Sequence, residues 1–214
     1  MDIMFKRLMA KNFRKPSGLF GRYIISFLKK NQVEYDEMDS LLKLNKDDVV
    51  LEIGYGLGNG IYDYAKKNDC TFHGIDFSRL MYSKAVKLNH ENIKRGKVIL
   101  QCADFDDYIF ENDTFHCIYF LNVIYFWNEI HGRLKKIFSM LKQNGKVIIF
   151  MADAEFFKDN KLFEGESIFH RHCIGDVVKE MEKTGFKAIE TTEHTKLKKC
   201  YYVIGYKNNL SNSD

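Results

Sequence analysis

A short apolar run that breaks into alternating glycines constrains this chain more than any other feature. Residues 49–53 read Val-Val-Leu-Glu-Ile, and glycines follow at positions 54, 56, 58 and 60. This pattern predicts a buried strand, a tight loop and then a helix that starts near residue 61. Glycine takes positive φ and lets the backbone approach a ligand closely because it has no Cβ. We expect such a loop to bind a nucleotide-like ligand.

The acid within this run indicates what kind of ligand to expect. The loop departs from the dinucleotide pattern G-x-G-x-x-G, because Asn59 stands where the third glycine belongs. Glu52 lies at the end of an otherwise apolar strand, where a carboxylate is costly unless it has a polar partner. We interpret Glu52 as a sign that the ligand is cationic.

The run E-x-G-x-G-x-G resembles the first motif of class I S-adenosylmethionine-dependent methyltransferases. Their cofactor carries a sulfonium and an ammonium group but no phosphate. The resemblance implies that Gly54, Gly56 and Gly58 pack beside the methionine part of S-adenosylmethionine, with Tyr55 in the same cofactor-binding loop. It also implies that Glu52 holds the amino group of the cofactor or orders the loop.

The rest of the chain alternates between strand and helix patterns. Apolar runs near residues 70–76, 97–102, 114–121 and 147–151 predict further strands, and stripes at helical spacing lie between them. One stripe, from residue 130 to 141, predicts a helix that Asn144 and Gly145 end. A helix over 176–183 and a closing hairpin, 186–192 with 200–206, complete an α/β doubly wound, seven-stranded, mostly parallel sheet with an antiparallel last strand. The resemblance implies the same Rossmann-like arrangement.

Two strand ends carry acids that suit a nucleoside, since ligands bind at the carboxyl ends of the strands in open α/β sheets. Asp76 is placed to accept both ribose hydroxyls, and Phe77 to stack on adenine; the competing interpretation is that Asp76 caps the helix that starts at Ser78. Asp104 and Phe105 resemble the adenine clamp of the family, although an acidic loop without that role fits the same residue types.

The fourth strand end is expected to lie beside the methyl group. By resemblance Asn122 is the polar residue there, and the absence of a following proline weighs against the exocyclic amines of DNA bases. The aromatic run 125–127 is a candidate wall for the acceptor, with burial in the core as the alternative. Methyl transfer needs a base only if the acceptor arrives protonated, and the candidates are Tyr125, His170 and His172. We expect no metal site at His170 and His172, because no distant ligand completes a shell.

The domain organisation is expected to be simple. We predict an arm or lid over the cofactor site in residues 1–34 and a single methyltransferase domain over residues 35–214. Within that domain, residues 152–175 interrupt the strand–helix alternation and are predicted to form an inserted lid segment.

Composition narrows the compartment and the partners. Five cysteines without a C-x-x-C pair are typical of a reducing compartment, and no run approaches membrane-spanning length, so we expect a cytoplasmic protein. The formal net charge of +4 is spread among acidic residues and gives only weak support for nucleic-acid binding. The oligomeric state is left open.

These observations lead to one hypothesis and two alternatives. The leading hypothesis is an S-adenosylmethionine-dependent methyltransferase that acts on a small-molecule acceptor, resembling the group that includes ubiquinone and menaquinone methyltransferases. An NAD-dependent oxidoreductase shares the glycine loop and Asp76. An RNA or protein methyltransferase is supported only by the basic segment 6–30.

Overall fold

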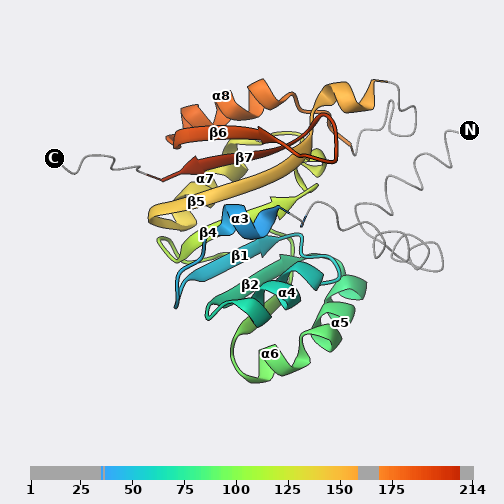
Figure 1. Cartoon of the computed structure of the whole chain (residues 1–214), viewed down its shortest axis with the longest axis vertical. Coiled ribbons are helices and arrows are strands. Elements are labelled where there is room, and N and C mark those ends of the chain that lie inside the picture. Colours follow the sequence, from blue (N-terminus) through green and yellow to red (C-terminus); the bar gives the residue numbers. More distant parts are fainter. Residues whose placement is uncertain (1–34, 36, 159–168, 208–214) are drawn as a thin grey trace, which may run out of the picture.

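The computed structural model describes residues 35, 37–158 and 169–207, and within them the chain forms one seven-stranded sheet (Figure 1). The strand order is β3-β2-β1-β4-β5-β7-β6. β1 to β5 pair in parallel, and β7 is antiparallel to both of its neighbours. The strands are β1 Val49–Ile53, β2 Thr71–Asp76, β3 Val98–Cys102, β4 Phe115–Leu121, β5 Leu141–Ala152, β6 Lys187–Glu193 and β7 Cys200–Tyr206.

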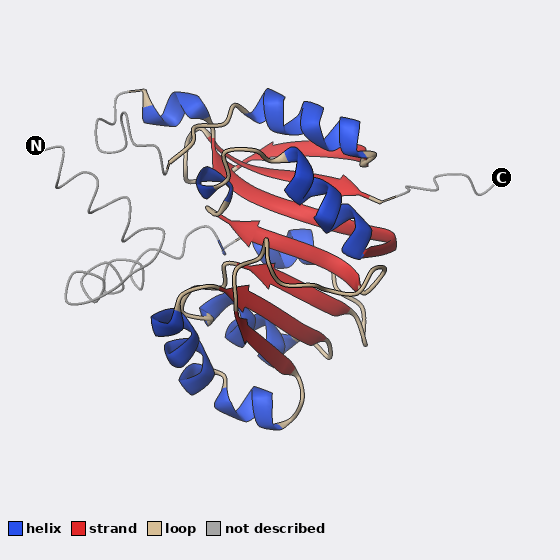
Figure 2. Ribbon diagram, turned by 180° about the vertical axis from the view of Figure 1, so that it is seen from behind, coloured by secondary structure: helices blue, strands red, loops and turns tan. Residues whose placement is uncertain are grey.

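Helices cover both faces of this sheet. α3 and α4 lie in front of it in Figure 1, and Figure 2 shows α7 and α8 over the opposite face. Strands covered on both sides are largely buried, which is why β1, β4 and the second half of β5, residues 147–152, read as almost continuous apolar runs. The α-helices are α3 Met38–Leu42, α4 Asn59–Lys67, α5 Arg79–Leu88, α6 His90–Lys94, α7 His131–Met140 and α8 Ile174–Thr184, and the 3₁₀ helices are η2 Ile124–Phe126 and η3 Ala154–Phe157.

The predicted architecture is confirmed, including the antiparallel hairpin at the end of the sheet. Local signals for helix ends also hold. The hydroxyl of Ser78 accepts the N–H of Met81 at the start of α5, and Gly185 ends α8 at φ 111°. Because the chain takes up the strand order of a doubly wound sheet, the carboxyl ends of β1, β2, β3 and β4 meet at one edge.

One predicted boundary is wrong. The helix expected to run to Asn144 and Gly145 ends at Met140, and β5 begins at the next residue. Leu141 is extended, pairs with Phe115 of β4 and is fully buried. Its place in the apolar stripe therefore reflects burial in the sheet, which helical spacing alone does not distinguish from burial on a helix.

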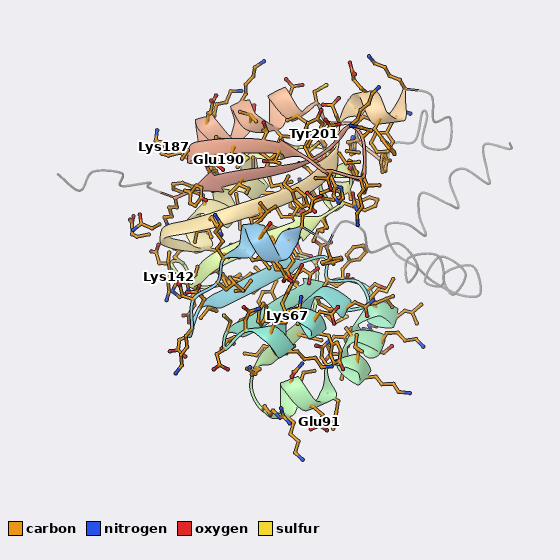
Figure 3. All side chains as sticks on the ribbon, in the orientation of Figure 1. Lys67, Glu91, Lys142, Lys187, Glu190 and Tyr201 are labelled. Atoms are coloured by element: carbon orange, nitrogen blue, oxygen red, sulfur yellow. The ribbon has the colours of Figure 1, made fainter. Side chains whose placement is uncertain are left out.

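The surface carries mixed charge. Lys67, Glu91 and Lys187 are exposed on different elements, α4, α6 and β6 (Figure 3). In the part of the chain that the structure describes, no helix combines the length and apolar character that a membrane crossing requires. The predicted arm over residues 1–34 and part of the predicted lid segment, residues 159–168, lie outside the described residues.

Candidate active site

A cavity of about 460 Å³ opens at the carboxyl edge of the sheet. Eight of the ten predicted cofactor-binding residues line it, and so does the candidate base Tyr125. These eight are Gly54, Tyr55, Gly56, Asp76, Phe77, Asp104, Phe105 and Asn122. The predicted residues Glu52, Gly58, His170 and His172 lie outside its lining. The edge of the sheet thus gathers residues that are up to 71 positions apart in sequence, from Gly54 to Tyr125.

The glycine loop forms one wall, and its glycines have different tasks. Gly54, at φ 73°, has no room for a side chain, because a Cβ there would lie 2.5 Å from Val123 Cγ2. Gly56, at φ 53°, faces open space, and a Cβ there would meet no atom within 4 Å. Gly58 is the N-cap that precedes α4, and a Cβ there would meet Ala85 Cβ at 2.8 Å. Gly56 is therefore the glycine that leaves the cavity free for a ligand.

Asp76 fastens this loop to the end of β2. Its carboxylate accepts the N–H of Gly56 at 3.0 Å through Oδ2 and the N–H of Ser78 at 2.8 Å through Oδ1. The expected contact with the helix start is thus present, and the same carboxylate also faces the cavity. Burial raises the pKa of Asp76 to about 6, against the two hydrogen bonds that lower it. A hydrogen-bonding or cationic partner at this point stabilises the charged form.

Glu52 lies beneath the cavity instead of in its wall. It is 1% exposed, and its oxygens accept the hydroxyls of Tyr35 at 2.7 Å and Tyr119 at 2.9 Å. Burial raises the pKa of Glu52 to about 7, although both hydrogen bonds lower it. Tyr35 itself lines the cavity, and its ring lies against Gly60, where a Cβ would come within 2.3 Å of it. Glu52 therefore reaches the site through Tyr35.

A loop after β3 forms the next part of the wall. Phe105 stacks on Trp127 with ring centroids 6.0 Å apart. The ammonium of Lys136 on α7 donates to the carbonyls of Phe105, Asp106 (3.1 Å) and Tyr108 (2.7 Å). One cation thus satisfies three carbonyls and fixes the loop that carries Asp104 and Phe105.

Arg133 joins the same loop from one turn earlier on α7. Its guanidinium pairs with the carboxylate of Asp106 and lies 5.6 Å from the ring of Trp127. Sequence reasoning missed Arg133, Lys136 and Tyr35. The positions of the two cations at i and i+3 place them on one face of a helix, but nothing in the sequence says which loop that face meets.

The end of β4 carries Asn122 and Tyr125. Asn122 takes φ 59°, a left-handed conformation that asparagine adopts more readily than most residues. The hydroxyl of Tyr125 accepts the N–H of Ala152 and donates to Asn122 Oδ1 at 3.5 Å. Burial raises the pKa of Tyr125 well above its ordinary value. Its phenol is therefore held in the protonated form at neutral pH.

Aromatic rings close the cavity at the side of β4 and β5. The predicted aromatic run 125–127 lines it, and Tyr125 and Trp127 are at the same time buried against the core. The candidate base His170 approaches only through its backbone, whose N–H donates to the Tyr125 carbonyl at 2.7 Å. His172 Nε2 bonds the Trp127 carbonyl at 3.0 Å, and burial lowers the pKa of this imidazole. Among the described residues, no three His, Cys, Asp or Glu side chains gather into a metal-binding group.

The cavity therefore has two halves. The carboxylate half is formed by Gly54, Gly56, Asp76, Asp104 and Phe105, on the loops after β1, β2 and β3. The aromatic half is formed by Tyr125, Phe126, Phe156, Phe157 and Phe169, on and beyond the segments after β4 and β5.

Comparisons with known proteins agree with this geometry. The family model described as a methyltransferase domain matches residues 50–145. Phosphoethanolamine N-methyltransferase 2 of Caenorhabditis elegans is 26% identical over 168 residues, which cover 75% of this chain and 38% of that protein. The tRNA U34 carboxymethyltransferase of Aliarcobacter butzleri is 28% identical over 188 residues, which cover 84% of this chain and 60% of that protein.

A solved structure shows the same fold. Phosphoethanolamine N-methyltransferase 2 of Haemonchus contortus, in complex with S-adenosyl-L-methionine, matches with a TM-score of 0.62 and 22% identity over 90% of this chain and 43% of that chain. The chain spans less than two thirds of the length of each of these three relatives.

The strand order and the glycine loop agree with a class I S-adenosylmethionine-dependent methyltransferase, and residues 50–145 match the methyltransferase domain family. The domain match and the shared fold support S-adenosylmethionine as the cofactor. The match favours a methyltransferase over the alternative of an NAD-dependent oxidoreductase. The relatives reported above carry other names than ubiquinone or menaquinone methyltransferase, so that subgroup stays a prediction.

Proposed function

We propose that the protein transfers the methyl group of S-adenosylmethionine to a small-molecule acceptor by in-line displacement. The observation that carries this proposal is that the carboxylate half and the aromatic half line one continuous cavity. In an in-line reaction the acceptor must lie next to the methyl group, and proximity and orientation supply on the order of 7–11 kcal/mol in favourable cases. A shared cavity allows that arrangement.

The residues of the carboxylate half suit the cofactor. Gly56 leaves open space at the wall. Each oxygen of Asp76 accepts one backbone N–H, and a carboxylate has about four acceptor positions, so capacity for ribose hydroxyls remains. Asp104 accepts one N–H through Oδ1 and lines the cavity. When bound, S-adenosylmethionine supplies an electrophilic methyl group on a sulfonium, and its positive charge favours the ionised form of Asp76.

The remaining residues orient and enclose the reactants. We assign Glu52 and Tyr35 to the support of the glycine loop, because Tyr35 lines the cavity while Glu52 holds its hydroxyl from below. We assign Asn122 and Tyr125 to the positioning of the reacting groups at the end of β4, since both line the cavity and their side chains are in contact. The rings of the aromatic half exclude water from the acceptor.

Binding and turnover test the proposal in sequence. Calorimetry is expected to show that both S-adenosylmethionine and S-adenosylhomocysteine bind. Incubation of the labelled cofactor with a cell extract is then expected to place the methyl label in the low-molecular-weight fraction. A chain that binds neither compound contradicts the proposal.

A polynucleotide acceptor is the second candidate, because one relative carries the name of a tRNA-modifying enzyme. The basic segment 6–30 that favours it in the sequence lies outside the described residues. In the same labelling experiment this candidate predicts label in the RNA fraction and binding that weakens steeply with salt. Label in RNA alone would replace the small-molecule proposal.

A further inference from the structure

The rings of the aromatic half form one packed cluster. Tyr125 stacks on Phe169 with centroids 4.8 Å apart, and Phe157 meets Tyr125 at 5.4 Å and Phe169 at 5.1 Å, edge to face. Phe156 packs on Phe157 at 5.2 Å and is 46% exposed. The cluster draws its members from η2, η3 and the segment before α8, so the fold brings three separate pieces of chain to this end of the cavity.

Charge is absent from this half among the described residues. Among the described residues, the charged side chains that line the whole cavity are Asp76, Asp104, Asp106 and Arg133, and they lie outside the aromatic half. The one cation among these, Arg133, already pairs with Asp106 and donates to the Glu129 carbonyl. A phosphate or carboxylate in the aromatic half would lose its hydration without gaining a cation from the described chain.

The aromatic half also lacks a base among the described residues that line it. Besides the five rings, the cavity residues at the ends of β4, β5 and β7 include Asn122, Trp127, Phe150, Ala152 and Cys200, and none of these carries an imidazole or a carboxylate. The Tyr125 hydroxyl is engaged with Ala152 and Asn122. An acceptor that must lose a proton before it reacts, such as an alcohol or a phenol, would find no described imidazole or carboxylate here to take that proton.

We propose that the aromatic half binds an amine on an apolar, phosphate-free body and that the enzyme methylates the nitrogen of its uncharged form. This inference rests on the proposed function and names its acceptor class. The lone pair of the amine nitrogen forms the new N–C bond while the C–S bond breaks, and the electron pair of that bond stays on sulfur. Positive charge moves from sulfur to nitrogen, where ring faces stabilise it. The amine loses its proton to water before it enters the cavity, and the product leaves as the methylated ammonium ion.

Three probes of matched size test this class on the full chain. Phenethylamine carries the amine on an apolar body, 2-phenylethanol replaces the amine with a hydroxyl, and phosphoethanolamine replaces the apolar body with a phosphate. With the protein saturated by S-adenosylhomocysteine, calorimetry is expected to show that phenethylamine binds more tightly than either of the other two. With S-adenosylmethionine, mass spectrometry is expected to find N-methylated phenethylamine. Preferential binding or methylation of phosphoethanolamine or 2-phenylethanol overturns the inference, and so does the absence of any methylated amine.

Variants separate recognition of charge from burial of apolar surface. Phe157→Leu and Phe169→Leu keep apolar bulk and remove the ring, so affinity for phenethylamine is expected to fall by between about two- and thirtyfold while affinity for 2-phenylethanol changes little. Ile109→Ala, at a residue that is 90% exposed, is the surface control and should change neither. An equal loss for both probes overturns the role of the rings in binding charge.

The controls also keep the two proposals apart. If Phe157→Leu and Phe169→Leu do not fold, Phe156→Leu at the exposed edge of the cluster takes their place, with the same expected difference between the probes. If S-adenosylhomocysteine binds but the amine is rejected, the acceptor class is wrong while methyl transfer to another small molecule stands. If S-adenosylhomocysteine does not bind, both proposals fail.

Discussion

The two halves of the cavity are built in different ways. The carboxylate half is fixed by backbone: Gly54 and Gly56 take positive φ, and the Gly56 N–H is tied to Asp76. The aromatic half is fixed by side chains, because Tyr125, Phe157 and Phe169 hold one another through ring contacts. The carboxylate half is thus a backbone cradle, which tolerates few substitutions. An apolar cluster such as the aromatic half can exchange residues of similar volume with a modest loss of stability. This difference suits a constant cofactor beside an acceptor that differs among related enzymes.

The sharpest test of the backbone cradle compares two neighbouring glycines. Gly54→Ala adds a Cβ 2.5 Å from Val123 and forces an alanine into positive φ, so the free energy of unfolding should fall by about 2–5 kcal/mol. Gly56→Ala also forces an alanine into positive φ but adds no clash, so its free energy of unfolding should fall by only about 1–2 kcal/mol. Urea unfolding measures both changes.

When only folded protein is compared, Gly56→Ala should lower the affinity for the cofactor more than Gly54→Ala does. The new methyl group of Gly56→Ala enters the open space of the cavity, so its calorimetric affinity for S-adenosylhomocysteine should fall even where the protein is fully folded. Equal stability losses in the two variants, or unchanged affinity in Gly56→Ala, would contradict the description of the carboxylate half as a fitted cradle.

A second test uses the buried carboxylate below the cradle. Burial raises the pKa of Glu52 from 4.5 to about 7, so the folded state holds its proton more tightly than the unfolded state does. The corresponding stability is fully present below about pH 4.5 and is lost as pH rises through about 7, a loss on the order of 3 kcal/mol. Asp76 acts in the same direction at lower pH, because burial raises its pKa from 3.8 to about 6.

Glu52→Gln removes the titration and keeps one acceptor oxygen for a tyrosine hydroxyl, while its NH2 group can donate to the oxygen of the other tyrosine. The wild-type protein should lose stability between pH 5 and pH 8 relative to this variant, measured as the difference between their urea unfolding free energies. The exposed Glu111→Gln is the matched control and should track the wild-type protein. A pH dependence that Glu52→Gln shares with the wild-type protein would show that Glu52 is not the group that titrates.

The carboxylate half was predictable because its signals are local. The glycines, Asp76 and Asp104 each stand directly after an apolar run, and parallel strands bring such positions together at one edge. The same reasoning placed Glu52 at the site without revealing that two tyrosines cover its carboxylate. Burial of a strand residue on one face or the other depends on what packs there, and sequence pattern does not supply that.

The supporting contacts were not predictable. Lys136 meets the loop of Phe105 from 31 positions away, and Tyr35 meets Glu52 from 17 positions away. Both contacts follow from the way a helix or a segment docks on the sheet, and lysine and tyrosine occur on many helix surfaces without such a role. The boundary at Leu141 failed for a similar reason, since an apolar residue at helical spacing was buried by β4 instead.

The last test concerns Tyr125, which belongs to the aromatic half and touches Asn122. Tyr125→Phe keeps the ring contacts and removes the hydroxyl that accepts the Ala152 N–H. The free energy of unfolding should fall by about 1–3 kcal/mol, the cost of a buried donor without a partner. Tyr62→Phe is the control, because the Tyr62 ring on α4 lies against the ammonium of Lys66. Its free energy of unfolding should fall by less.

Kinetics then decide whether this hydroxyl positions the reactants or removes a proton. Because burial raises the pKa of Tyr125, its phenol stays protonated at neutral pH, and the variant should lower the methylation rate without changing the pH at which the rate is half-maximal. A shift of that midpoint would make Tyr125 the general base. The aromatic half would then accept alcohols and phenols as well as amines. The remaining difference between the two halves would be that backbone fixes the carboxylate half and side chains fix the aromatic half.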